Sequence, residues 1–150
     1  MLAEAGDAIV AGVERELPSW VRREVARILD AWGRIGASER GDAERAAAVA
    51  GEAAARRVVA ALRALFAADV SEQRATPLEI VRTAYREPTA VLAAAGVPPV
   101  ERDAFDERAW PDDRYGLVPR TLGDLDEDLA PLQLVWGMAK SKALRARDAV

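Results

Sequence analysis

Apolar residues in the N-terminal part of the chain recur at helical spacing. The first stripe is formed by Ile9, Val13 and Leu17. Beyond Pro18 a second stripe advances in steps of three and four, and its members are Val21, Val25, Ile28, Trp32 and Ile35. Because proline removes a backbone donor and clashes with the preceding turn, the pattern predicts two N-terminal helices within about residues 7–35, divided at Pro18. Gly36 is expected to end the second helix in a left-handed conformation.

A long helix is predicted at about residues 43–69, where no proline interrupts the chain. Ser38 and Asp42 are candidate N-cap residues, since their side-chain oxygens can accept a hydrogen bond from the first free N–H groups. The small residues Ala47, Gly51 and Ala55 lie four apart in its first half. Glycine inside a helix costs about 1 kcal/mol relative to alanine. Gly51 therefore indicates that another helix packs closely against this one.

The segment Thr76-Pro77-Leu78-Glu79 has the pattern of a helix N-terminus. Threonine can cap the helix, proline suits the first helical position, and a glutamate three residues after the cap can complete a capping box. The pattern predicts a helix over about residues 77–95 that is kinked by Pro88, and Gly96 is expected to end it.

Residues 98–130 are expected to form an irregular, acidic loop region. A short helix within residues 100–110, an extended run at Leu117–Pro119 and a short helix capped by Thr121 are predicted inside it. The last helix is predicted at about residues 131–148. Together these elements predict a single all-α domain, a helical bundle over residues 1–150, with Trp32 and Trp136 as core anchors.

Composition supports the all-α prediction and removes much catalytic chemistry. Alanine makes up about a fifth of the 150 residues, and it is the strongest helix former. The chain contains no cysteine and no histidine, which excludes thiolate nucleophiles, disulfides, Cys/His zinc sites and imidazole proton relays. The acidic start of the chain, and apolar runs that are shorter than the roughly 20 residues of a membrane span, predict a cytoplasmic protein without a secretory signal or membrane span.

The acidic run Asp124–Asp128 begins like a calcium loop, because carboxylates alternate along it. A calcium-binding EF-hand needs glycine at its sixth position and glutamate at its twelfth, where this chain has Leu129 and Val135. The sequence also lacks the glycine-rich phosphate loops of nucleotide-binding proteins. We therefore expect no metal, no cofactor and no catalytic residue, although carboxylates, tyrosine and lysine leave an enzyme as an alternative.

Two groups of residues are candidates for interaction. Trp110, Asp112, Asp113, Arg114 and Tyr115 lie in a turn-rich loop. Their side chains either pack down on the bundle or form a recognition surface. The basic residues Lys140, Lys142, Arg145 and Arg147 crowd the end of the last helix. They can bind nucleic acid if they converge on one face, or form a solvated helix end.

The C-terminal half resembles a family of small uncharacterised proteins from actinobacteria. The resemblance rests on Thr76–Glu79, Tyr85–Thr89, Ala95–Pro99, Trp110–Asp113 and Trp136–Lys140. An alanine- and arginine-rich composition that is poor in lysine is typical of a genome with high GC content. The resemblance implies no particular activity, cofactor or catalytic residue.

The sequence predicts a non-enzymatic, cytoplasmic protein–protein interaction or regulatory module, with a protein partner or a homodimer formed through an alanine-rich or aromatic face. One alternative is a nucleic-acid or ribonucleoprotein-associated factor that uses the basic C-terminal helix, although the sequence pI of about 5.0 disfavours it. A further alternative is a small-molecule sensor with an apolar pocket between helices. No membrane partner is expected.

Overall fold

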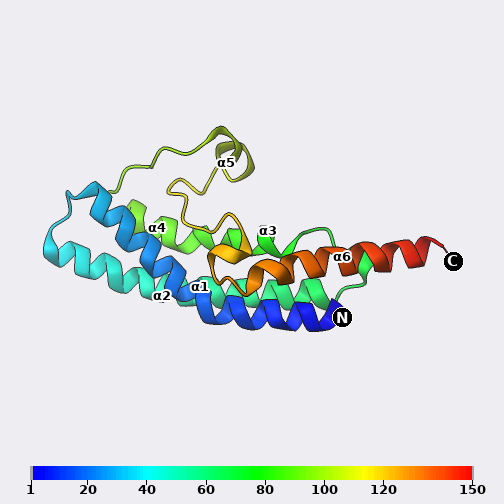
Figure 1. The fold of residues 1–150 in the computed structure, drawn as a ribbon. Coiled ribbons are helices and arrows are strands. Elements are labelled where there is room, and N and C mark those ends of the chain that lie inside the picture. Colours follow the sequence, from blue (N-terminus) through cyan, green and yellow to red (C-terminus); the bar gives the residue numbers. More distant parts are fainter. Residues whose placement is uncertain (1, 150) are drawn as a thin grey trace.

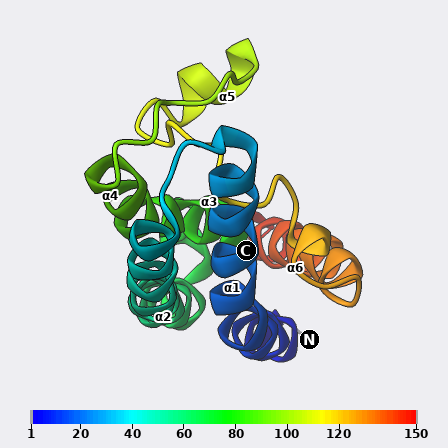
Figure 2. The ribbon, with the colours of Figure 1, turned by 90° about the vertical axis from the view of Figure 1, so that its left-hand side faces the viewer.

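The computed structural model describes residues 2–149, and within that range the fold is all-α without a strand. Two 31-residue helices, α1 (Leu2–Trp32) and α2 (Ala37–Ala67), lie side by side and antiparallel. The C-terminal helix α6 (Leu129–Asp148) packs on α1, and Figure 2 shows α1 between α2 and α6. The segment α3–α4 packs against α2. The predicted all-α fold is confirmed.

The prediction of two N-terminal helices divided at Pro18 is wrong, because α1 continues through this proline. Figure 1 shows a bend midway along α1, as expected where a proline removes one backbone hydrogen bond. The apolar stripe keeps its phase across the proline, and the fully buried residues are Ile9, Val13, Leu17, Val21 and Val25. Burial of one continuous face on both sides of Pro18 outweighs the roughly 3 kcal/mol that an internal proline costs.

The turn between α1 and α2 also differs from the prediction. Gly33, with φ of +65°, adopts the left-handed conformation that follows the end of α1, whereas Gly36 has φ of −70° and is the N-cap of α2. The helix predicted from about residue 43 therefore begins at Ala37. Ser38 and Asp42 lie inside α2 and do not cap it, and Asp42 instead pairs with Arg45 on the helix surface. Trp32 is only partly buried against the core.

The close helix approach predicted at Gly51 is confirmed. A Cβ atom at Gly51 would lie 3.3 Å from the Val21 Cβ and 3.4 Å from the Pro18 carbonyl oxygen. The neighbouring small residues Ala47 and Ala55 are buried in the same interface. The bend of α1 and the small residues of α2 therefore meet at one place, where the two backbones approach each other.

The helix predicted over residues 77–95 consists of α3 (Pro77–Arg82), a 3-10 turn η2 (Thr83–Tyr85) and α4 (Arg86–Ala94). The predicted capping box is confirmed: the Glu79 N–H donates to Thr76 Oγ1 over 3.2 Å, and the Thr76 N–H donates to Glu79 Oε2 over 3.1 Å. The 3-10 turn contains Ala84, the residue whose carbonyl Pro88 cannot bond because proline has no N–H. Gly96, with φ of +81°, ends the segment as predicted.

Shorter elements connect the long helices. These are η1 (Val70–Glu72), α5 (Ala104–Ala109) and η3 (Leu122–Asp124). Figure 1 shows α5 and its flanking loops on one side of the bundle, and α6 extending beyond the end of the bundle towards the C-terminus. Trp136 on α6 is buried and packs edge-on against Phe66, with 6.2 Å between the ring centroids, as expected for a core anchor.

Candidate functional site, the outer face of α6

Two of the five residues predicted to form a recognition surface are inside the protein. Asp113 and Tyr115 are each 1% exposed. The Tyr115 hydroxyl donates a hydrogen bond of 2.6 Å to the Val97 carbonyl oxygen. Asp113 Oδ1 accepts a hydrogen bond of 3.0 Å from the Leu117 N–H. The hypothesis that these two side chains face a partner is therefore wrong. They follow the other alternative and pack down on the bundle.

Trp110 is half-buried rather than presented to solvent. Its ring lies edge-on to Tyr85, with 6.4 Å between centroids, and the Arg82 guanidinium lies 5.1 Å from its ring centroid. Asp112 and Arg114 are exposed and line a recess of about 500 Å³ with Tyr85, Arg86 and Thr89. The aromatic part of the loop is thus folded inward, because it has apolar area to bury against α3 and η2.

Charged side chains beneath this loop hold α5 against α3. Arg82 is buried and pairs with Asp106 over 3.3 Å, and Arg120 pairs with both Asp103 and Asp106. Burial raises the pKa of Asp113, although the charges of Arg82 and Arg102 lower it in part. The pKa of Asp103 is lowered by hydrogen bonds from the Asp106 backbone N–H and from Arg120. The Arg82–Asp106 pair is buried and the Arg120 pairs lie at the surface, and all of them join parts of the loop region to one another or to α3.

The four basic residues predicted to form one face of the last helix lie on two sides of α6. Lys140 Nζ donates a hydrogen bond of 3.0 Å to the Gln73 carbonyl oxygen and lies 5.1 Å from the Trp136 ring centroid. Arg147 pairs with Asp69. Lys140 and Arg147 are seven residues apart in the sequence, so they share the side of α6 that faces the rest of the protein.

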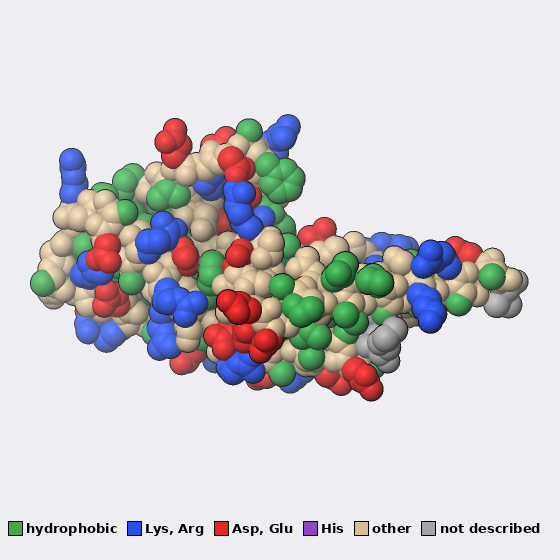
Figure 3. Space-filling view, viewed as in Figure 1, with side chains coloured by type: hydrophobic (Ala, Val, Ile, Leu, Met, Phe, Trp, Pro, Cys, Tyr) green, Lys and Arg blue, Asp and Glu red, His purple; other side chains and the backbone are tan. Residues whose placement is uncertain are grey.

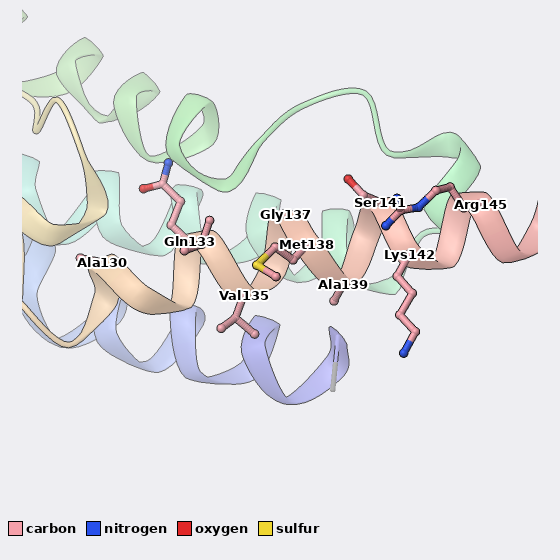
Figure 4. Close-up of a pocket in the computed structure, with 10 residues that line it drawn as sticks. Ala130, Gln133, Val135, Gly137, Met138, Ala139, Ser141, Lys142 and Arg145 are labelled. Atoms are coloured by element: carbon pink, nitrogen blue, oxygen red, sulfur yellow. The ribbon is translucent and has the colours of Figure 1, made fainter.

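Lys142 and Arg145 lie on the other side of α6, where neither forms an ion pair with the described residues. Their side chains border a shallow groove along the helix, together with Val135 and Met138 (Figure 4). The expected single basic face is therefore corrected. The 100° rotation between successive residues of a helix divides the four cations into two pairs.

Exposed apolar side chains mark this side of α6 as unusual. Leu134 is 65% exposed, Met138 is 64% exposed and Val135 is 37% exposed. We call the surface formed by Leu134, Val135, Met138, Lys142 and Arg145 the outer face of α6. Its groove has a volume of about 920 Å³. A single exposed apolar residue needs no explanation, but three on adjacent turns of one helix form a patch typical of an interaction site.

Sequence reasoning missed this patch, although the signal was present. Leu134 and Met138 are one helical turn apart, and both lie opposite the buried Trp136 on the helix circumference. A helix that is apolar on two sides buries one against its own bundle and leaves the other for a second contact. The prediction for this helix named only Trp136, the core anchor on its buried side.

Charge is ordered along α6. The exposed residues Glu127 and Asp128 directly precede the helix, the apolar side chains occupy its middle, and Lys142 and Arg145 follow. Figure 3 shows acidic, hydrophobic and basic side chains in this order along α6. Neither Glu127 nor Asp128 forms a side-chain ion pair with the described residues, whereas the neighbouring Asp126 pairs with Arg15 over 2.9 Å.

The acidic run before α6 serves the local fold. Asp124 Oδ2 accepts hydrogen bonds of 3.1 Å from the N–H groups of Arg120 and Thr121. The Asp128 N–H donates to Asp126, which together with the Arg15 contact lowers the pKa of Asp126. Within residues 2–149 no cluster of three or more acidic side chains is arranged to hold a metal ion.

Comparisons of the chain with protein-family models, with curated proteins and with solved structures gave no match. The resemblance of the C-terminal half to an actinobacterial family therefore stays a prediction. No helix in the described part of the chain is long and apolar enough to span a membrane.

Proposed function

We propose that this chain is a cytoplasmic, non-enzymatic protein–protein interaction module that docks a protein through the outer face of α6. The observation that carries the proposal is the exposure of Leu134 and Met138, at 65% and 64%, on a helix whose opposite side is fixed to the bundle by Trp136. The fixed side holds the exposed side in a defined orientation. A partner therefore meets a preorganised surface, which lowers the entropic cost of binding.

The composition of the outer face suits a protein partner. Burying apolar surface contributes about 25 cal/mol per Å², so Leu134 and Met138 can act as the anchors of an interface. Methionine adapts its shape to the surface that it meets. Lys142 and Arg145 at the edge of the groove favour association with an acidic segment and fix its orientation.

The charges favour a protein over a nucleic acid. Of the four basic residues, Lys140 and Arg147 already contact Gln73 and Asp69. The acidic residues Glu127 and Asp128 lie at the other end of α6 and would repel a phosphate backbone that followed the helix. Two free cations are a weak phosphate-binding surface, because affinity for nucleic acid grows with the number of neutralised phosphates.

Site-specific photo-crosslinking in the native cells tests the proposal. A photoreactive residue replaces Met138 in one variant and Val49 in a control variant, since Val49 on α2 is 67% exposed but stands alone. We expect a covalent adduct with a specific protein from position 138, resistant to nuclease, and none from position 49. Absence of an adduct at position 138, equal labelling at both positions, or adducts with nucleic acid alone would contradict the proposal.

A further inference from the structure

The charge order along α6 identifies the partner that fits it. We infer that the outer face of α6 docks a second copy of this chain, with the two α6 helices side by side and antiparallel about a two-fold axis. This inference rests on the proposed function, in which that face binds a protein. It adds the identity of the partner and the register of the contact.

The order of acidic residues before α6, apolar residues in its middle and basic residues after them complements itself in only one direction. In a parallel pair, Glu127 would meet the partner's Glu127 and Arg145 would meet the partner's Arg145, which places like charges together. In an antiparallel pair, the acidic end of each helix meets the basic end of the other. A two-fold axis perpendicular to the helices generates this antiparallel arrangement, and two-fold dimers are the commonest homo-oligomers.

One register satisfies the apolar and the charged contacts together. Placing Leu134 opposite the partner's Met138 centres the pair of helices on position 136. In this register the two residue numbers of each facing pair average 136, so Glu127 lies opposite the partner's Arg145. Asp128 lies within one turn of the partner's Lys142 in the same register. Each dimer contains every one of these contacts twice.

The shape of the molecule leaves room for this contact. The C-terminal part of α6, which carries Lys142 and Arg145, extends beyond the bundle (Figures 1 and 3), so this part of the helix is open to a second helix. A 20-residue helix is about 30 Å long. A contact between single helices of this length is at the small end of stable interfaces, and we therefore expect a weak dimer that depends on concentration.

The order of charges also disfavours the other occupants of an apolar helix face. An anionic membrane surface would attract Lys142 and Arg145 on α6 but repel Glu127 and Asp128, which directly precede the helix. An unrelated protein would have to supply the complementary order of basic, apolar and acidic side chains. A second copy of α6 supplies it without any further requirement.

Sedimentation equilibrium of the purified full chain tests the inference through a charge exchange. We expect a reversible monomer–dimer equilibrium in the unmodified protein. Glu127→Arg and Arg145→Glu should each raise the dimer Kd by about tenfold, because each places like charges opposite one another twice. The double variant Glu127→Arg/Arg145→Glu should return the Kd to within about threefold of the original. Glu52→Arg is the matched control, since Glu52 is exposed on α2, and α1 lies between α2 and α6 (Figure 2).

The outcomes separate this inference from the proposed function. A protein that stays monomeric at every concentration, or a double variant that associates no better than either single variant, overturns the inference. If the protein is monomeric but position 138 crosslinks to a different protein, the interaction module stands and the second copy does not. If position 138 also gives no adduct, both are wrong. Helicity and melting temperature measured on each variant, all at exposed positions, show that the fold is kept.

Discussion

Asp113 Oδ1 accepts a hydrogen bond of 3.0 Å from the Leu117 N–H, in a loop for which the sequence left packing on the bundle and a recognition surface as alternatives. The carboxyl is 1% exposed, and burial raises its pKa from the ordinary value of 3.8. An aspartate with a raised pKa in the folded state keeps its proton to higher pH than it does in the unfolded chain. Its ionisation therefore opposes folding, although its hydrogen bond orders the loop.

Asp113→Asn should gain stability relative to the unmodified protein as the pH rises. The contribution of Asp113 to stability falls as the pH increases from the unfolded pKa of about 3.8 through the raised folded pKa. Asparagine does not titrate and can still accept the Leu117 hydrogen bond through its side-chain oxygen. Urea unfolding at pH 4 and pH 7 measures the difference in unfolding free energy between the two proteins. A difference that does not grow with pH would show that the charge of Asp113 carries no net cost.

Tyr115→Ala should destabilise the protein strongly. The ring is buried, and its hydroxyl donates to the Val97 carbonyl oxygen over 2.6 Å. Truncation of a buried aromatic side chain costs about 3–5 kcal/mol. Asp112→Ala is the control, because Asp112 is exposed in the same loop, and its change should stay within about 0.5 kcal/mol. Thermal unfolding of the two variants distinguishes a packed loop from a recognition surface, in which both substitutions would leave the melting temperature unchanged.

Glu87→Gln should weaken the attachment of α4 to α2. The Glu87 carboxylate pairs with Arg57 through two hydrogen bonds of 2.9 and 3.1 Å, while Arg57 also donates to the Thr83 carbonyl oxygen. Burial alone would raise the pKa of Glu87, but the Arg57 hydrogen bonds lower it overall from 4.5. The loss at neutral pH should be about 1–2 kcal/mol, since both partners are half-buried.

The same variant has a defined pH dependence. A lowered folded pKa means that the pair contributes fully above the unfolded pKa of about 4.5, and that this contribution is lost as the pH falls through the folded pKa. The stability difference between Glu87→Gln and the unmodified protein should therefore shrink below pH 4.5. Glu52→Gln serves as the control, because Glu52 forms no ion pair with the described residues. An equal loss in both variants would mean that the Arg57 contact does not stabilise the fold.

Local sequence signals predicted those parts of the fold that depend on neighbouring residues. The capping box at Thr76 and the left-handed Gly96 follow from backbone requirements that act within one turn. The close approach at Gly51 was predictable because a glycine inside a helix needs a packing reason. These features are set by chemistry that is readable over four or five residues.

The errors arose where tertiary packing decides between local alternatives. Pro18 is a helix breaker by local rules, but the apolar stripe continues in phase from Leu17 to Val21, and burial of the whole stripe keeps α1 continuous. For Tyr115 the sequence left burial and a recognition surface as alternatives. The structure shows burial, and the carbonyl that accepts its hydrogen bond belongs to Val97, 18 residues earlier, beyond the reach of a local pattern. The sequence shows that Leu134 and Met138 lie opposite Trp136 on the last helix, but only the packing of the bundle shows which of the two sides stays exposed.

Gly137→Ala should stabilise α6 without disturbing any contact. Gly137 lies in the middle of this helix, and a Cβ atom added there would meet nothing within 4 Å. Alanine loses less backbone entropy than glycine when a helix forms, so the free energy of unfolding should rise by about 0.5–1 kcal/mol. For a domain of this size, each kcal/mol raises the melting temperature by about 2–4 °C.

Gly51→Ala provides the matched control for this prediction. It offers the same gain in helix propensity, but its Cβ atom would lie 3.3 Å from Val21, which is tighter than ordinary contact. The gain there should be smaller or absent because α1 and α2 must move apart slightly. Thermal unfolding of both variants at low protein concentration, where self-association does not contribute, separates the two effects. A loss of stability in Gly137→Ala would show that position 137 is not in open space and that the outer face of α6 is already covered.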